Sequence, residues 1–204
     1  MKLYWSSRSP YVRKVMICAH ERGLAERIEC VRSIVAMSQA NPVVMRANPL
    51  GKIPTLVLDD GRILYDSAVI CEYLDSLGRG PALFPAQGER RWTALRRHAL
   101  GDGMLDTLIL WRAELAKPQA RQTPEWLMTF ALKIRNALDA IEAEADALTH
   151  EPFDIGSVAI AVALAYLDFR FAHLDWRNGH PRAAALAAQF SQRDSIQQTK
   201  FIDA

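Results

Sequence analysis

The sequence predicts an α/β domain followed by an all-α domain, and three observations support this division. Strand and helix patterns alternate over roughly the first eighty residues. A stretch rich in Gly and Pro, residues 79–88, then interrupts both periodicities. Beyond it only helical patterns remain. We therefore expect domains at residues 1–78 and 89–204, joined by a linker at 79–88.

The first domain begins with the strand "KLYW" (2–5). A helix follows, because apolar residues between Val12 and Ala19 recur at helical spacing and Gly23 supplies a stop. "RIECVRSI" (27–34) alternates in polarity and predicts a second strand. A weak helix or a loop then leads to "NPLGKIP" (48–54).

Two apolar runs in "TLVLDDGRILYD" flank Asp60-Gly61, a dipeptide that favours a hairpin turn because the turn needs positive φ. The residues from Val69 to Leu77 then repeat at helical spacing, and the helix stops at Gly78. The order β-α-β-(α)-β-β-α predicts a mixed four-stranded sheet.

Four helices are expected in the second domain. The first spans 89–117, and the second starts with Thr123 as its cap and Pro124 in its first turn. Ser157 is the expected cap of a third helix, which is apolar nearly all round and is therefore expected to be central. A fourth helix begins near Pro181.

Composition limits the class of protein. Half of the 204 residues are hydrophobic, which argues for a sizeable core, and a net charge of +2 does not indicate binding to nucleic acid. Cys18, Cys30 and Cys71 form no C-x-x-C, so neither a disulfide framework nor a metal site is expected, and all three are expected in the core. No signal peptide and no membrane-spanning run is predicted, so we expect a cytoplasmic protein without a membrane partner.

The layout and three motifs resemble the cytosolic glutathione transferases. "SPYVRKV", "NPLGKIPTLVLDDGRILYDS" and "LFP" are similar to that family's first helix start, its proline turn with hairpin, and its linker. The best match is to small bacterial members that carry serine at the thiol site. The resemblance implies a thioredoxin-like first domain, glutathione as co-substrate and a homodimer. One departure is Ile160, which stands where the family often has an acid in the first turn of its buried helix.

The serines before the first helix are the candidate catalytic residues. Ser9 followed by Pro10 is a good helix cap, and a helix N-terminus also favours a thiolate placed there. The resemblance implies that a serine donates a hydrogen bond to the glutathione sulfur. Ser9 occupies the place of the nucleophilic cysteine in cysteine-type relatives, and Ser6 the catalytic place in other serine-type classes. We consider Ser9 first, Ser6 second and Ser7 third.

Two further segments are candidate glutathione-binding elements. The resemblance implies a cis bond before Pro54, which would let the backbone of Ile53 pair with the cysteinyl part of glutathione. Asp66 is either a simple helix cap or faces the ligand's ammonium group, while Ser67 would hold the γ-glutamyl carboxylate. Lys52 would balance the glycyl carboxylate, although a turn lysine is commonly just solvated.

Gly101 and Gly103 lie inside the first long helix of the second domain, although glycine is unfavourable there. Either close packing against another helix or a bend in the helix would explain them. An alternative is a wall over the active site in which Met104, Leu108 and Trp111 line an apolar pocket for the second substrate.

The predicted function is that of a glutathione transferase that stabilises the glutathione thiolate for attack on a small apolar electrophile. Two alternatives stay open. One is a non-catalytic member that carries a ligand or docks on another protein, since fold alone does not imply catalysis. The other is a glutathione-dependent thiol-disulfide reductase, which would usually have cysteine at the site.

Overall fold

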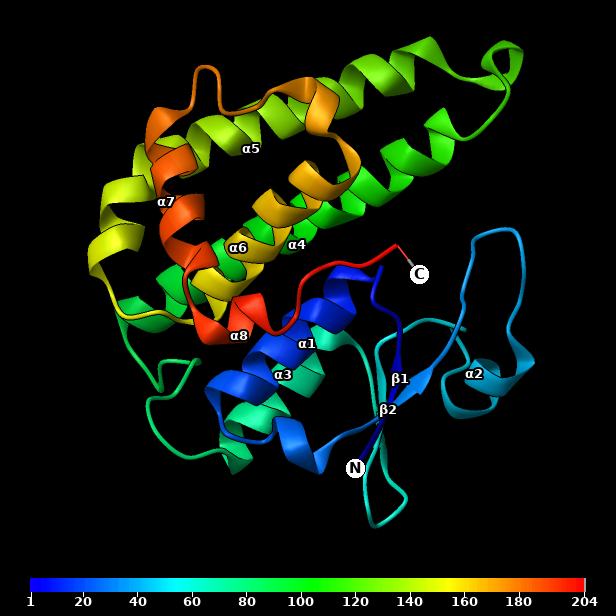
Figure 1. Cartoon of the computed structure of the whole chain (residues 1–204), viewed down its shortest axis with the longest axis vertical. Coiled ribbons are helices and arrows are strands. Elements are labelled where there is room, and N and C mark those ends of the chain that lie inside the picture. The colour runs from blue at the N-terminus through cyan, green and yellow to red at the C-terminus, as the bar shows by residue number, and fades with distance from the viewer. Residues whose placement is uncertain (204) are drawn as a thin grey trace. The chain divides into compact units, whose positions relative to one another are not determined.

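A computed structural model describes residues 1–203, which form two compact units (Figure 1). Unit 1 comprises Met1–Pro85 together with the segment from Asp194 onward, and unit 2 comprises Ala86–Arg193. The boundary falls inside the predicted linker. The segment from Asp194 onward, which we expected in the helical domain, instead belongs to unit 1, because its side chains and carbonyls bond to the first helix of that unit.

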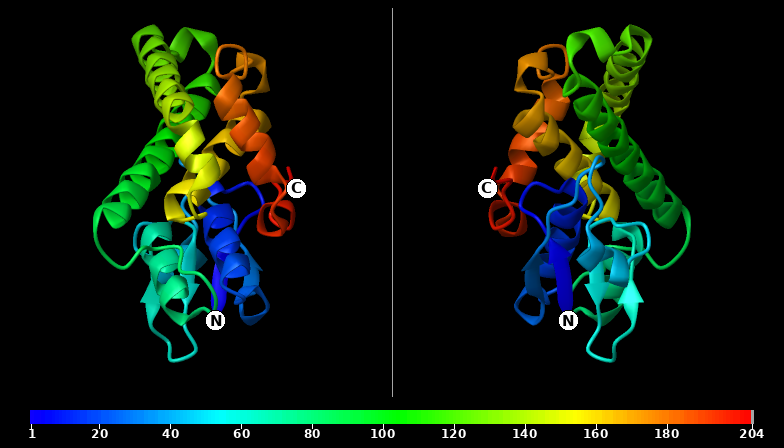
Figure 2. Two further views of the ribbon diagram at one scale, coloured as in Figure 1. Left: turned by 90° about the vertical axis from the view of Figure 1, so that its left-hand side faces the viewer. Right: turned by 90° about the vertical axis from the view of Figure 1, so that its right-hand side faces the viewer.

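Unit 1 is a four-stranded sheet with helices on both faces. Its elements are β1 (Lys2–Trp5), α1 (Pro10–Glu21), η1 (Ala25–Arg27), β2 (Glu29–Arg32), α2 (Pro42–Ala47), β3 (Thr55–Val57), β4 (Ile63–Leu64), α3 (Ser67–Leu77) and α8 (Asp194–Gln197). The strand order is β2-β1-β3-β4, with β1 parallel to β2 and antiparallel to β3. The predicted element order and the mixed sheet are confirmed. In Figures 1 and 2, α1 and α3 lie on one side of the sheet and α2 on the other.

The core of unit 1 lies between the sheet and the pair α1 and α3. Leu3 of β1 and Leu56 of β3 are fully buried there, as are Cys18 of α1 and Cys71 of α3. The core placement of these two cysteines is confirmed. The same expectation for Cys30 is wrong: its thiol is exposed, because β2 is an edge strand.

Unit 2 is all-helical. Its elements are α4 (Glu89–Leu115), η2 (Gln119–Arg121), α5 (Pro124–His150), α6 (Ile155–Arg170), η3 (Ala172–Leu174) and α7 (Pro181–Ser191). Figure 1 shows α4 and α5 as two long neighbouring helices, with α6 packed along α4. Helix α6 is buried without interruption from Ile155 to Leu164, so the expected central helix is confirmed. Among residues 1–203, no helix is both long and apolar enough to cross a membrane.

The start of α6 differs from the expectation. Asp154, not Ser157, is the cap: its Oδ1 accepts hydrogen bonds from the backbone N–H groups of Gly156 (2.9 Å) and Ser157 (3.1 Å). The helix therefore begins two residues before Ser157, and one carboxylate oxygen satisfies two of the donors that every helix start leaves free. Because Asp154 is the cap, the third residue of α6 is Ser157, so Ile160 lies beyond the first turn and is not the position at which an acid would complete a capping box. Burial raises the pKa of Asp154.

Thr123 stands at the predicted cap position of α5, but its side chain makes no capping bond. Its backbone N–H instead donates to Glu114 Oε1 of α4 at 2.8 Å, which ties the start of α5 to the preceding helix.

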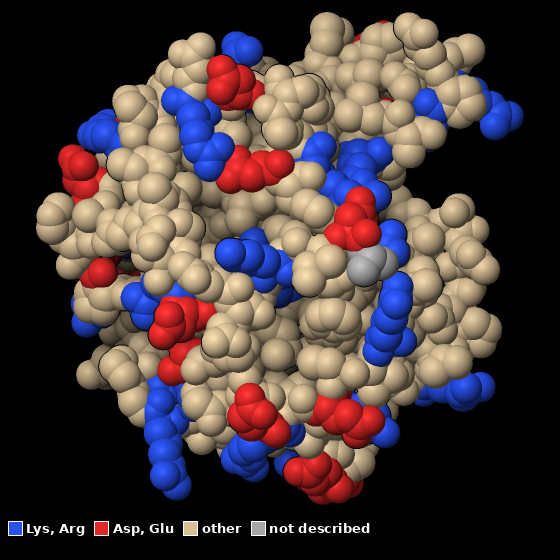
Figure 3. All heavy atoms as spheres, viewed as in Figure 1, with Lys and Arg blue, Asp and Glu red and all other residues tan. Residues whose placement is uncertain are grey.

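Acidic and basic side chains are interspersed over the face of the protein drawn in Figure 3. This distribution agrees with the small net charge of +2.

Candidate functional site

The register of the sheet brings three separate segments of unit 1 to one edge. Tyr4, near the end of β1, pairs with Thr55 at the start of β3, and Leu56 pairs with Leu64 at the end of β4. Because these pairs are antiparallel, the turn after β1, the turn before β3 and the turn after β4 all leave the sheet at the same end. These turns hold Ser6 to Ser9, Ile53-Pro54 and Asp66-Ser67.

Ser9 is the cap of α1. Its Oγ accepts from the backbone N–H of Val12 at 3.3 Å, with Pro10 as the first helical residue. The side chain of Ser6 is also an acceptor, from the N–H of Arg8 at 3.3 Å. A hydroxyl has one proton and two lone pairs. The protons of Ser6 and Ser9 thus have no acceptor among the described residues.

Ser7 differs from its two neighbours. Its Oγ donates to the carbonyl of Ile202 at 2.8 Å, and the N–H of Ile202 lies 3.4 Å from the carbonyl of Ser7. The hydroxyl proton of Ser7 is therefore used by the C-terminal segment. This distinction between the three serines depends on a residue far away in the sequence.

The turn before β3 is held by two buried side chains, Asn48 and Thr55, which were not among the predicted site residues. Asn48 donates from Nδ2 to the carbonyl of Lys52 (3.1 Å) and to Thr55 Oγ1 (3.0 Å), and Thr55 Oγ1 donates to the same carbonyl (2.8 Å). The "NPLGKIPT" stretch contains both residues, so an asparagine before Pro49 was the available signal.

The Ile53–Pro54 peptide bond is cis, as the resemblance implied. Among the described residues, neither the backbone N–H nor the C=O of Ile53 has a hydrogen-bond partner, although its side chain is buried. Lys52 is exposed beside it. The turn can therefore offer one donor and one acceptor to an extended peptide.

At the start of α3, Asp66 is the cap that the sequence predicted. Its Oδ1 accepts from the N–H of Ala68 at 3.0 Å, and the Tyr65–Asp66 peptide bond is cis. Asp66 is exposed, while Ser67 is buried in the first turn. The capping contact uses one oxygen of the carboxylate and leaves the other available.

Helices α1 and α3 thus begin at this edge, and each N-terminus carries roughly half a positive charge with unpaired N–H donors. The arrangement suits a negatively charged ligand with a peptide backbone. Across residues 1–203, no three His, Cys, Asp or Glu side chains group in a way that could hold a metal ion.

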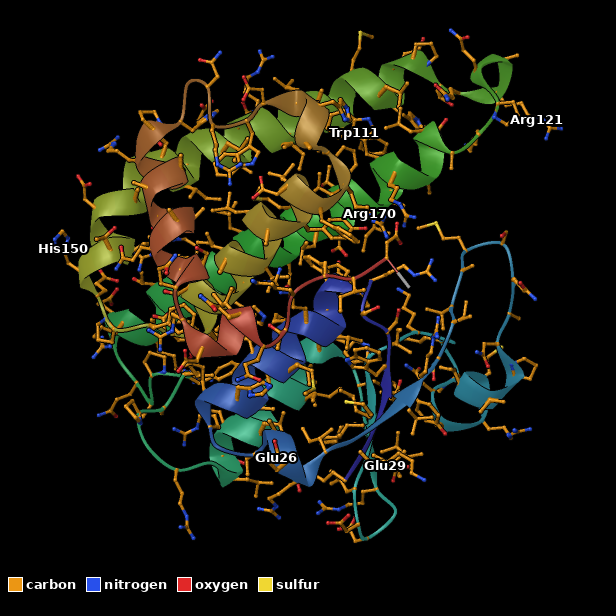
Figure 4. All side chains as sticks on the ribbon, viewed as in Figure 1. Glu26, Glu29, Trp111, Arg121, His150 and Arg170 are labelled. Atoms are coloured by element: carbon orange, nitrogen blue, oxygen red, sulfur yellow. The ribbon has the colours of Figure 1, made fainter. Side chains whose placement is uncertain are left out.

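The residues proposed for a second-substrate wall do not form one. Met104, Leu108 and Trp111 are all buried, and the Trp111 ring packs on Phe171 with a centroid distance of 5.1 Å. Figure 4 labels Trp111 among the helices of unit 2. The apolar side chains of α4 at these positions serve as core. The close-packing interpretation of Gly101 is confirmed, since this glycine lies against Ala159 of α6.

Family models match most of the chain. Residues 8–77 match the model described as "Glutathione S-transferase, N-terminal domain", and residues 109–188 match "Glutathione S-transferase, C-terminal domain". Among curated proteins, the uncharacterized GST-like protein YibF of Escherichia coli K12 is 31% identical over 202 residues, which cover 98% of each chain.

Solved structures agree with these matches. A glutathione transferase family member from Pseudomonas fluorescens Pf-5, with bound glutathione, is 42% identical with a TM-score of 0.94 over 98% of both chains. A glutathione S-transferase from Methylobacillus flagellatus KT, with glutathione bound, is 32% identical with a TM-score of 0.87, covering 98% of this chain and 99% of the other.

Proposed function

Because this chain belongs to the glutathione S-transferase family, we propose that it is a glutathione transferase that ionises the glutathione thiol for attack on a small apolar electrophile. The observation that carries the proposal is the meeting of three turns at one edge of the sheet of unit 1, where two helix N-termini, two hydroxyl protons and an unpaired peptide backbone are available. Two relatives of known structure contain bound glutathione, which supports the choice of ligand.

Ser9 and Ser6 are the proposed donors to the sulfur. A free thiol titrates near ~8.5, and lowering that pKa by about two units requires ~2.7 kcal/mol of preferential thiolate stabilisation. A hydrogen bond to a charged group contributes about 1.5–3 kcal/mol and a helix terminus about 0.3–1 kcal/mol. One serine proton and the start of α1 are therefore sufficient. Ser7 ranks third because its proton is donated to Ile202.

The rest of the tripeptide is assigned to the other two turns. The N–H and C=O of Ile53, next to cis-Pro54, pair with the cysteinyl backbone, and Lys52 balances the glycyl carboxylate. The γ-glutamyl carboxylate binds at the start of α3, on the N–H and hydroxyl of Ser67. The free oxygen of Asp66 faces the γ-glutamyl ammonium group, so Asp66 is both a cap and a ligand.

The reaction follows from this placement. The thiolate sulfur attacks the electrophilic carbon and forms a C–S bond, and the electron pair of the broken bond leaves with the departing group or is protonated after addition. The protein contributes orientation and stabilisation of the thiolate. The serine donates a hydrogen bond and forms no covalent intermediate.

We also propose that the protein acts as a homodimer in the cytoplasm. Large apolar side chains are exposed on α4 and α5, among them Trp92, Leu110 and Leu132, and such surface favours a protein interface. The three cysteines are free, which fits a reducing compartment. Sedimentation velocity tests the dimer: a monomer at every concentration would contradict it.

The first experiment is a pH titration of glutathione thiolate absorbance in the presence of wild type, Ser6→Ala, Ser9→Ala and, as a matched control, Ser7→Ala. We expect wild type and Ser7→Ala to lower the thiol pKa, and one of the other two variants to restore it while glutathione remains bound. Binding without a lowered pKa would instead favour a ligand carrier. If the protein did not bind glutathione, the proposal that it is a glutathione transferase would be refuted.

A reductase is tested in the same preparation. The position of the nucleophilic cysteine in such enzymes is Ser9, and the exposed Cys30 lies on β2 rather than at the start of α1. We expect no glutathione-dependent reduction of a mixed disulfide substrate.

A further inference from the structure

Unit 1 contains a cavity of about 140 Å³ between the end of β1, α1, Cys30 of β2 and the C-terminal segment. Its lining includes Ser7, Arg13, His20 and Lys200, and it reaches Cys30 on β2. None of its lining residues belongs to the turns before β3 and after β4, which are proposed to bind the peptide backbone and the γ-glutamyl group of glutathione. Ser6 lines this cavity and is also a proposed catalytic serine, whereas Arg13, His20 and Lys200 have no role in the proposed transferase chemistry.

Arg13 is the unusual residue of the cavity wall. Its side chain is only 7% exposed, yet no carboxylate among the described residues pairs with it. One Nη donates to the carbonyl of Ile196 at 3.2 Å, and the guanidinium lies over the ring of Phe201 at 4.5 Å. Among residues 1–203, the buried Nε–H has no hydrogen-bond partner. Burial lowers the pKa of Arg13 to about 10.

These contacts do not fully compensate for burying the Arg13 guanidinium. A guanidinium carries five N–H donors and a full positive charge, and a carbonyl and an aromatic ring supply neither a formal negative charge nor an acceptor for Nε. A buried charge is costly unless it is paired and hydrogen-bonded.

The other lining residues of the cavity add positive charge and hydroxyl groups. Lys200 and His20 contribute basic groups, Ser6, Ser7 and Thr199 contribute hydroxyls, and none of the lining residues carries a carboxylate.

The nearest carboxylate along β2 does not reach the cavity either. Figure 4 labels Glu29, which directly precedes Cys30 on this strand. Successive side chains of a strand point to opposite faces, so Glu29 faces away from the cavity that Cys30 lines. Glu29 instead forms an ion pair with Lys2 at 3.8 Å.

We propose that this cavity binds a small oxyanion, a phosphate or a carboxylate group, through the guanidinium of Arg13. The planar fork of arginine matches either group, and a negative charge would pair the buried cation. The volume of 140 Å³ is several times the ~30 Å³ that one water molecule occupies in the liquid, so it accommodates such a group. Because Ser6 and Ser7 also line the cavity, a bound anion would lie beside the turn that carries the proposed catalytic serines.

The direct test observes the Nε–H of Arg13 by ¹H–¹⁵N NMR of the full chain without glutathione. Inorganic phosphate, and acetate in a parallel series, replaces chloride at constant ionic strength. We expect a saturable shift of the Arg13 Nε–H resonance with one of the two anions, which also identifies the group that binds. The exposed Arg62 is the internal control and should not respond. If neither anion moves the Arg13 signal, the proposal is wrong.

Variants provide the second measurement. In Arg13→Lys the charge remains but the fork is lost, and Arg62→Lys is the matched control. The melting temperature of wild type and Arg62→Lys should rise with the bound anion along a saturating curve, and the affinity in Arg13→Lys should fall at least about tenfold. An equal rise in all three proteins would refute the site. If Arg13→Lys does not fold, the NMR titration of wild type decides.

Neither measurement requires glutathione or a transferase assay, so the outcome is independent of the proposed function.

Discussion

Arg22, just after α1, forms a buried ion pair with Asp75 of α3, with 3.0 Å between Nε and Oδ1. The two side chains are 5% and 8% exposed. The guanidinium also donates to backbone carbonyls of Asp75, Gly78, Gly80 and Pro81, and the carboxylate accepts from the N–H groups of Leu83 and Phe84. The first half of the predicted linker is therefore fixed on unit 1 by this pair.

Asp75→Asn should destabilise the protein strongly. The substitution leaves the Arg22 charge buried without its counter-ion, and removing one partner of a buried pair costs about 3–5 kcal/mol. Urea unfolding followed by circular dichroism measures the change. Arg62→Gln is the control, because it breaks the fully exposed pair with Asp60 and should have no measurable effect. If the two substitutions lowered the free energy of unfolding equally, the buried Arg22–Asp75 pair would not have the stabilising role described above.

Gly101 and Gly103 of α4 should respond to alanine in opposite directions. A Cβ at Gly101 would lie 2.6 Å from the carbonyl carbon of Ala159, so α4 and α6 would have to separate, at a cost of about 1–3 kcal/mol. A Cβ at Gly103 meets nothing within 4 Å. Gly103→Ala should therefore gain up to ~1 kcal/mol from helix propensity. Thermal unfolding of the two variants tests this, and a loss in both would contradict it.

Two substitutions of Asp154 distinguish the contribution of its capping hydrogen bonds to stability from that of its charge. Asn caps about as well as Asp, so Asp154→Asn should be at least as stable as wild type at neutral pH, whereas Asp154→Ala should lose ~1 kcal/mol. Because burial raises the folded-state pKa of Asp154, the folded state favours the protonated acid.

Wild-type stability relative to Asp154→Asn should therefore fall as pH rises from the unfolded value near ~3.9 through the higher folded-state pKa, and then level off. Urea unfolding from pH 3 to pH 7 measures the difference. A constant difference would show that the carboxyl titrates identically in both states.

Asp66→Asn tests whether this cap also binds glutathione. The amide oxygen can still accept from the N–H of Ala68, so stability should change little, but the charge that we propose to face the ligand's ammonium group is lost. We expect about tenfold weaker binding of glutathione by calorimetry, which corresponds to ~1.4 kcal/mol. Asp59→Asn, in the hairpin turn, is the control. If Asp66→Asn bound glutathione as tightly as wild type, Asp66 would serve only as the cap of α3.

Local sequence signals determined the elements of this protein and their order. Proline after a Ser or Thr at the cap position predicted the starts of α1 and α5 at Pro10 and Pro124, and Asp60-Gly61 predicted the hairpin. These signals succeed because turns and helix starts depend on residues adjacent in the chain. The positions of the candidate site follow from the same signals, since each lies in a turn next to a recognisable strand or helix.

Only the tertiary structure decided which side chains at those positions are buried and which of their hydrogen-bond donors lack a partner. The hydroxyl proton of Ser7 is donated to Ile202, 195 residues away, while those of Ser6 and Ser9 have no acceptor within residues 1–203. The sequence pattern places Arg13 off the apolar face of its helix. In the structure it is buried because Ile196 and Phe201 of the C-terminal segment contact it. Burial and hydrogen-bond partners come from segments distant in the sequence, and no local pattern records which segments will meet.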